Sequence, residues 1–97
     1  MDDQDFCERA CWLCGKNGNG DPLELHHIFG GVMRSKSEKY GLTVYLCGNR
    51  CHRNGKQAVH RNAKTMLALH QWGQQKVMQE NGWDIDAFRR EFGKNYI

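Results

Sequence analysis

Two pairs of cysteines are the first residues of this chain whose type and spacing could carry chemistry. Cys11 and Cys14 are separated by two residues, and Cys47 and Cys51 by three. Tetrahedral zinc sites use paired thiolates at such spacings. If the segment between the pairs folds back, the four thiolates can meet at one structural Zn2+ that stabilises the fold. The alternative is four buried or free cysteines without a metal.

The histidines lie between the cysteine pairs and just after them. His26 and His27 are adjacent, His52 directly follows the last cysteine, and His60 comes eight residues later. Neighbouring residues of a strand project to opposite faces, so one imidazole can hold a divalent cation while the other takes a proton from water. Hydrolysis of a phosphodiester needs both functions. The alternative is that His26 or His27 joins the zinc ligands or lies on the surface, and His70 is expected to be a partly buried helix residue.

The elements that must position these side chains are two short strands and two helices. Residues 23–29 and 42–46 have the alternation and the β-branched content of strands, and a basic, polar connection joins them at 32–41. Apolar residues recur at helical spacing from about 60 to 81 and again from about 85 to 92. The sequence therefore predicts a single α+β domain over 1–97, with a core at about 7–80 and a helical extension at about 83–97.

The composition indicates that the hydrophobic core needs support. The chain has 97 residues, 39% of them apolar, and a domain of this size has only a small margin of stability. The start, Met1–Asp5, is acidic where a secretion signal would be basic, and no apolar run is long enough to span a membrane. We therefore expect a reducing cytosol, where paired cysteines bind metal rather than form disulfides. Cys7, the fifth cysteine, is interpreted as a free thiol, although it could replace Cys14 beside Cys11.

Positive charge is concentrated in the middle third of the chain. Residues 34–64 carry eight basic side chains and one acidic one. A phosphate backbone is the natural partner of such a surface, and the alternative is a solvated basic face without a partner. The side chains expected to contact DNA are Arg34, Lys36, Arg50, Arg53, Lys56 and Arg61.

Taken together, these motifs resemble the HNH endonucleases. Cys-x2-Cys is followed by Leu25-His26-His27-Ile28 with Gly-Gly after it, and then by a β-rich segment that ends in Leu-Cys-x3-Cys-His. The resemblance covers about residues 11–61. It implies a ββα-metal (His-Me finger) fold, in which two strands and a helix enclose one catalytic cation, with a separate four-cysteine zinc. The short, basic chain is similar to phage-encoded members, including recombination-enhancement nucleases, which implies the cytosol of a bacterium or of a phage-infected host.

The resemblance also implies roles for single histidines. His27 would be the general base and His26 the first ligand of the catalytic metal. His52 would match the closing residue of the motif as a second ligand, and His60 a further ligand placed on the helix. The implied catalytic ion is Mg2+ or Mn2+, and ligation by imidazole alone would also admit Zn2+ or Ni2+.

One residue of the family pattern is missing. The middle Asn, which braces the loop that carries the base, would lie near positions 40–43, where this chain has Tyr-Gly-Leu-Thr. Asn49 or Asn54 is expected to substitute for it. The function predicted is a metal-dependent DNA endonuclease, with DNA and either recombination proteins or a second copy as partners and no membrane. The alternative is a non-catalytic, zinc-stabilised DNA-binding or recombination accessory module.

Overall fold

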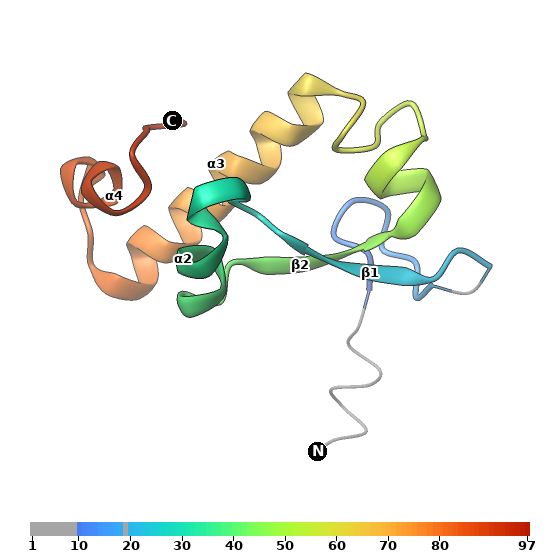
Figure 1. Ribbon diagram of the computed structural model, residues 1–97, viewed down its shortest axis with the longest axis horizontal. Coiled ribbons are helices and arrows are strands. Elements are labelled where there is room, and N and C mark those ends of the chain that lie inside the picture. The colour runs from blue at the N-terminus through green and yellow to red at the C-terminus, as the bar shows by residue number, and fades with distance from the viewer. Residues whose placement is uncertain (1–9, 19) are drawn as a thin grey trace, which may run out of the picture. The chain divides into compact units, whose positions relative to one another are not determined.

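The computed structural model describes residues 10–18 and 20–97, so Cys7 lies outside the described residues. In chain order the elements are strand β1 (Leu23–His27), the 3-10 turn η1 (Gly31–Met33), helix α2 (Arg34–Lys39), strand β2 (Thr43–Cys47), the π-helical turn η2 (Gly48–Arg53), helix α3 (Ala63–Asn81) and helix α4 (Ile85–Phe92) (Figure 1). The protein is a small α+β fold with a two-stranded sheet, as predicted. None of the helices in the described ranges combines the length and the apolar character needed to cross a bilayer.

The chain forms two compact units, each built from two separate stretches. The first contains the described residues up to His26 together with Val44–Ala63, and the second contains His27–Thr43 together with Lys64–Ile97. The C-terminal segment at 83–97 therefore belongs to a unit that also includes α2 and most of α3.

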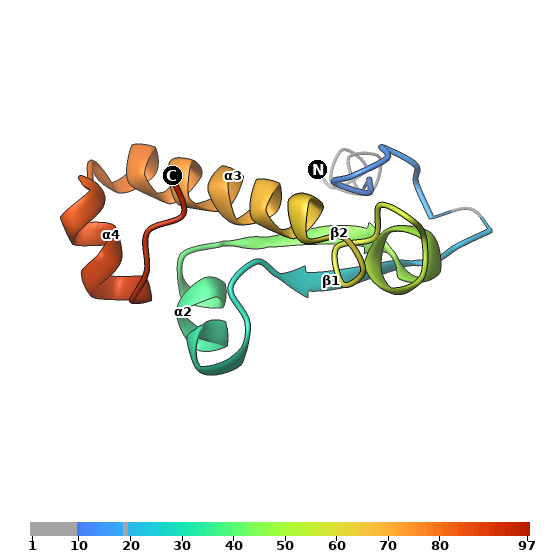
Figure 2. The same ribbon diagram turned by 90° about the horizontal axis from the view of Figure 1, so that it is seen from above.

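The two strands pair in antiparallel register. At one end the Gly48 N–H donates to the Pro22 carbonyl over 2.9 Å, and beyond the other end the Ile28 N–H donates to the Leu42 carbonyl over 3.0 Å. Figures 1 and 2 show the two strands running side by side. β1 ends two residues earlier than predicted, because the N–H of Phe29 donates to the Ser37 hydroxyl instead of a strand partner. β2 begins and ends one residue later than predicted.

The basic, polar connection predicted at 32–41 does join the two strands, but it contains most of η1 and all of α2, a helix that the sequence did not predict. The helix lacks an apolar stripe, and its one buried residue is Ser37. The Ser37 hydroxyl donates to the Leu42 carbonyl over 2.6 Å and accepts from the Phe29 N–H over 3.2 Å. A single buried hydroxyl thus joins the loop after β1 to the residue before β2.

Phe29 lies at the centre of an aromatic core in the second unit. Its ring centroid is 4.8 Å from that of Phe92, 5.2 Å from His70, 5.5 Å from Tyr96 and 5.7 Å from Phe88. Phe88 and Phe92 come from α4 and are buried. Edge and offset contacts of this kind add to the stabilisation that comes from area burial.

Helix α4 has the boundaries that the sequence predicted. The Asp84 carboxylate caps its N-terminus by accepting from the Ala87 N–H over 2.8 Å. Gly93 ends it with φ of 81°, a left-handed conformation that glycine adopts without steric cost.

Helix α3 extends to Asn81 as predicted but begins at Ala63, so His60 precedes the helix instead of starting it. Three of its buried residues, Thr65, Gly73 and Gln74, do not belong to the predicted apolar pattern. A Cβ on Gly73 would lie 2.9 Å from Cγ2 of Ile28, so the glycine permits close packing. The Gln74 amide holds the C-terminus, because its Oε1 accepts from the Tyr96 N–H over 2.8 Å.

Candidate metal centres

The four cysteines of the two pairs come together in the first unit. Their sulfurs all lie within 4.8 Å of one another, and those of Cys14 and Cys47 are 3.6 Å apart. Four sulfurs at about 2.3 Å from one tetrahedral Zn2+ would be about 3.8 Å apart. The group can therefore hold a metal ion, and its donor chemistry suits zinc.

Backbone hydrogen bonds attach the first cysteine turn to β2. The N–H of Trp12 donates to the Tyr45 carbonyl over 2.8 Å, and the Gly15 N–H closes the turn on the Cys11 carbonyl over 2.9 Å. Because β2 ends at Cys47, this contact places the two cysteine pairs side by side. The four thiols therefore meet although the two pairs are far apart in the sequence.

The second cysteine turn, η2, is capped by a distant carboxylate. Asp21 accepts from the Asn49 N–H over 3.0 Å and from the Arg50 N–H over 2.9 Å. These bonds lower the pKa of Asp21, as does the positive charge of Arg50. The Arg50 guanidinium in turn donates to the Cys47 sulfur over 3.4 Å. Both contacts fix the turn that presents Cys51 and His52.

The protonation of the thiols reflects their crowding. Partial desolvation of the Cys14 sulfur would by itself raise its pKa. Hydrogen bonds from the Lys16 backbone and from the other thiols outweigh this effect and lower that pKa to about 6. Burial raises the pKa of Cys47 and of Cys51. Four neighbouring thiolates repel one another, and a shared divalent cation removes that repulsion.

Three of the four predicted site histidines form a second cluster in the same unit. The ligand nitrogens of His26, His52 and His60 lie within 4.8 Å of one another. The Nε2 atoms of His52 and His60 are 3.1 Å apart, and the His26 ring centroid is 5.2 Å from that of His52 and 5.5 Å from that of His60. These three imidazoles can hold one metal ion.

The approach of His60 to His52 is built into the backbone. The Val59 N–H donates to the Cys51 carbonyl over 2.9 Å, and the His60 N–H donates to the His52 carbonyl over 3.2 Å. Ala58 and Val59 are buried and anchor the loop. The spacing of eight residues between His52 and His60 is longer than the resemblance leads one to expect. These two backbone hydrogen bonds, and not a helix, bring the two histidines together.

The histidine cluster offers three donors where the cysteine cluster offers four, and each cluster has one exposed member. His60 is exposed, and three protein donors leave one position of a tetrahedral ion for water or substrate. Partial burial, followed by the charges of His52 and Arg53, lowers the pKa of His60. The neutral imidazole is the form that binds metal.

His27 does not belong to this cluster. It is the last residue of β1, and its Nε2–H donates to Glu38 Oε2 over 3.0 Å, within the second unit. Its side chain is 11% exposed, whereas that of Glu38 is 70% exposed. The carboxylate therefore fixes the ring of His27 from the solvent side, and a neutral ring that donates through Nε2–H carries no proton on Nδ1.

The two asparagines expected to replace the missing Asn contact each other. Asn54 Nδ2 donates to Asn49 Oδ1, and both residues are exposed in the first unit. The loop that follows His27 is braced by Ser37, through the bonds described above. Sequence reasoning missed Ser37 because a serine in a polar helix gives no sign of burial.

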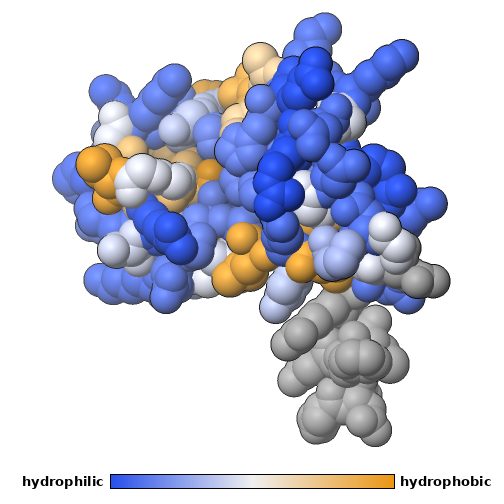
Figure 3. All heavy atoms as spheres, turned by 45° about the vertical axis from the view of Figure 1, so that its right-hand side comes forward, coloured by the Kyte–Doolittle hydropathy of each residue, from blue (hydrophilic) through white to orange (hydrophobic). Residues whose placement is uncertain are grey.

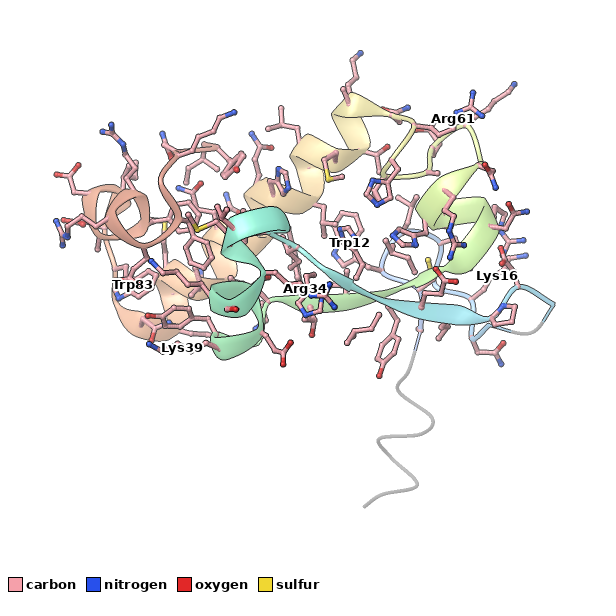
Figure 4. The ribbon with its side chains drawn as sticks, viewed as in Figure 1. Trp12, Lys16, Arg34, Lys39, Arg61 and Trp83 are labelled. Atoms are coloured by element: carbon pink, nitrogen blue, oxygen red, sulfur yellow. The ribbon has the colours of Figure 1, made fainter. Side chains whose placement is uncertain are left out.

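The six basic residues predicted to contact DNA fall into two groups. Lys36 donates to the Glu91 carbonyl over 2.7 Å, and Arg53 binds both the Gly48 carbonyl and the Glu24 carboxylate. Like Arg50, these two side chains have partners within the protein. Among residues 10–18 and 20–97, the exposed side chains of Arg34 and Lys56 have no such partner, and that of Arg61, on the loop leading into α3, makes one long contact of 3.5 Å (Figure 4).

Hydrophilic side chains cover most of the face shown in Figure 3, with smaller hydrophobic patches among them.

Comparison of the chain with family models, with curated proteins and with solved structures found no match.

Proposed function

We propose that this chain is a metal-dependent endonuclease that hydrolyses DNA phosphodiester bonds on an HNH-type ββα-metal core. The observation that carries the proposal is the pair of unlike clusters in one unit. Four thiols complete a tetrahedral set suited to a structural ion, whereas three imidazoles would leave one tetrahedral position open. Structural zinc sites are closed, and catalytic sites keep one position for water or substrate.

The general base is His27. It follows His26 directly in the sequence, and consecutive Cα atoms are about 3.8 Å apart, so the backbone of the proposed base adjoins that of a proposed metal ligand. With Nε2–H bound to Glu38, Nδ1 accepts the proton of the attacking water. A divalent cation bound by the three other histidines would supply the stabilisation of charge on the phosphate and the leaving oxygen.

The donor set favours a particular class of ion. Mg2+ and Mn2+ prefer oxygen ligands, whereas imidazole suits Zn2+ and Ni2+. Because the cluster consists of three imidazoles, we propose Zn2+ or Ni2+ in place of the Mg2+ or Mn2+ that the family resemblance implies. Zn2+ is the ion proposed for the cysteine cluster.

Affinity for DNA would come from the basic side chains that have no strong partner within the chain. Arg34, Lys56 and Arg61 are exposed and would contact backbone phosphates, with affinity that falls steeply as salt rises. No helix of the described chain is assigned to base reading. We therefore propose cleavage with little sequence preference.

The test is a nicking assay on supercoiled plasmid with Zn2+, Ni2+, Mn2+ or Mg2+ in turn. His27→Ala should lower the nicking rate by roughly 10²–10⁴-fold, the usual contribution of a general base. His70→Gln removes an imidazole outside both clusters and should nick at the rate of the unsubstituted protein. Circular dichroism would verify that both variants are folded.

Two results would refute the proposal in different ways. Nicking that survives His27→Ala unchanged would exclude His27 as the base. If the unsubstituted protein binds DNA but cuts it with none of the four ions, the alternative stands, in which the chain is a zinc-stabilised DNA-binding or recombination accessory module.

A further inference from the structure

We infer that Glu24 is a positioning residue for the histidine cluster. Glu24 lies on β1, two residues before His26 and on the same face of the strand. Its Oε1 accepts from Nδ1–H of His52 over 2.9 Å. This bond selects the tautomer of His52 that carries its proton on Nδ1, so that Nε2 is directed to the metal with its lone pair available.

The Nε2 atom of His52 faces the cluster. It lies 3.1 Å from Nε2 of His60, so the nitrogen that Glu24 leaves unprotonated is the one that meets the neighbouring ligand. Glu24 itself is not one of the grouped donors. Its role is therefore to act through His52, without binding the ion directly.

The carboxylate of Glu24 is itself held in place. Arg53 Nη2 donates to Oε1 over 2.6 Å and to Oε2 over 2.5 Å, while Arg53 Nη1 donates to the Gly48 carbonyl over 2.7 Å. Because Arg53 follows His52 in η2, one turn supplies both the ligand and the clamp on its partner. One guanidinium nitrogen thus holds both carboxylate oxygens, while the other nitrogen ties the guanidinium to the backbone.

Gly48 provides the space for this arrangement. A Cβ at that position would lie 2.9 Å from both Cδ and Oε2 of Glu24, closer than any side chain tolerates. A glycine at the start of η2 therefore lets the carboxylate lie against the backbone. Arg53 and Gly48 together form a socket for the Glu24 carboxylate, which in turn accepts from Nδ1–H of His52.

The socket also changes the interpretation of Arg53. The sequence suggested a phosphate contact, but its guanidinium is occupied by Glu24 and the Gly48 carbonyl. Loss of Arg53 should therefore act on metal binding, in the same direction as loss of Glu24. Outer carboxylates of this kind raise the basicity of the ligand, and their removal typically weakens metal binding by about 10–100-fold.

The inference rests on the metal site of the proposed function, but its test does not depend on nuclease activity. Protein already holding one equivalent of Zn2+ at the thiols is titrated with Co2+, and binding is followed by visible absorption and by calorimetry. Glu24→Gln, which removes the charge but keeps the size, should weaken binding of the second ion by about 10–100-fold. Arg53→Ala should weaken it in the same direction.

Glu80→Gln is the matched control, because it makes the same change at an exposed carboxylate that pairs with Lys76. It should leave Co2+ affinity unchanged. Retention of the first Zn2+ and an unchanged circular dichroism spectrum would show that the variants are folded. Glu24→Asp, which keeps the carboxylate, should recover part of the lost affinity.

The outcomes separate this inference from the nuclease proposal. Co2+ affinity that is equal in the unsubstituted protein and in both Glu24→Gln and Arg53→Ala would overturn the inference, whether or not the protein cuts DNA. Failure of the unsubstituted protein to bind a second ion would also overturn it. Weakened Co2+ binding in a protein that never nicks DNA would support the inference and count against the nuclease alone.

Discussion

Replacing Ser37 with alanine should be unusually costly for a substitution in a short polar helix. Ser37 is fully buried and its hydroxyl makes two hydrogen bonds, to the Leu42 carbonyl and from the Phe29 N–H. The Leu42 carbonyl would keep its bond from the Ile28 N–H. The Phe29 N–H would lose its partner in a buried position.

The magnitude follows from these two losses. A buried donor left without a partner costs about 1–3 kcal/mol, and the lost neutral bond to Leu42 adds about 0.5–1.5 kcal/mol. We therefore expect Ser37→Ala to lower the free energy of unfolding by roughly 2–4 kcal/mol. This is a large part of the stability of a small domain.

Urea unfolding with excess Zn2+, followed by tryptophan fluorescence, measures the effect. Ser35→Ala is the matched control, since it makes the same change in the same helix at an exposed position, and it should change the free energy by no more than about 0.5 kcal/mol. The same cost for both variants would refute the role given to the Ser37 hydroxyl. If the brace also serves His27, Ser37→Ala should slow nicking even at temperatures where the variant is folded.

Three further predictions concern other parts of the chain. Gly73→Ala should lower the free energy of unfolding in urea by up to about 2 kcal/mol, because overpacking against Ile28 costs about 1–3 kcal/mol and offsets the helix-propensity gain of about 1 kcal/mol. A variant more stable than the unsubstituted protein would contradict this. Burial lowers the pKa of His70, the hydrogen bond to the Ile28 carbonyl opposes this shift, and the charge of Lys94 adds to it. Because the folded state thus resists protonation of His70, the neutral imidazole contributes its full share of stability above about pH 6.5. That share is lost as the pH falls below this value. His70→Gln should therefore show a weaker loss of urea stability between pH 7 and pH 5, and an unchanged slope would exclude His70 as a source. Cys51→Ser or chelation should unfold the first unit, because structural zinc contributes about 10–16 kcal/mol of apparent binding free energy; circular dichroism that does not respond to Zn2+ would show that the ion is dispensable.

Local patterns in the sequence predicted several features well. The cysteine spacing anticipated the thiol cluster, because two- and three-residue gaps already determine how each turn can chelate. The apolar spacing at 85–92 located α4, and its observed caps, Asp84 and Gly93, act through contacts with nearby residues only. Strands and α3 were placed to within a few residues for the same reason.

Other features depended on contacts between distant residues and could not be predicted in this way. Gln74 is polar yet fully buried, because its amide binds the C-terminal segment that follows α4. Helix α2 was missed because Ser37, its buried residue, is not apolar. The sequence predicted Arg53 as a surface charge that contacts phosphate, whereas its guanidinium binds Glu24, 29 positions away.

The π-helical turn η2 has a consequence for how the protein would be loaded with metal. Cys51 and His52 are consecutive in it, so each candidate centre takes a donor from the same peptide unit. An ion bound by the sulfurs would order this peptide unit. The imidazole cluster would then lose less conformational entropy when it binds its own ion. Occupancy of the two centres should therefore be thermodynamically linked. Loss of an ion from either centre should weaken binding at the other.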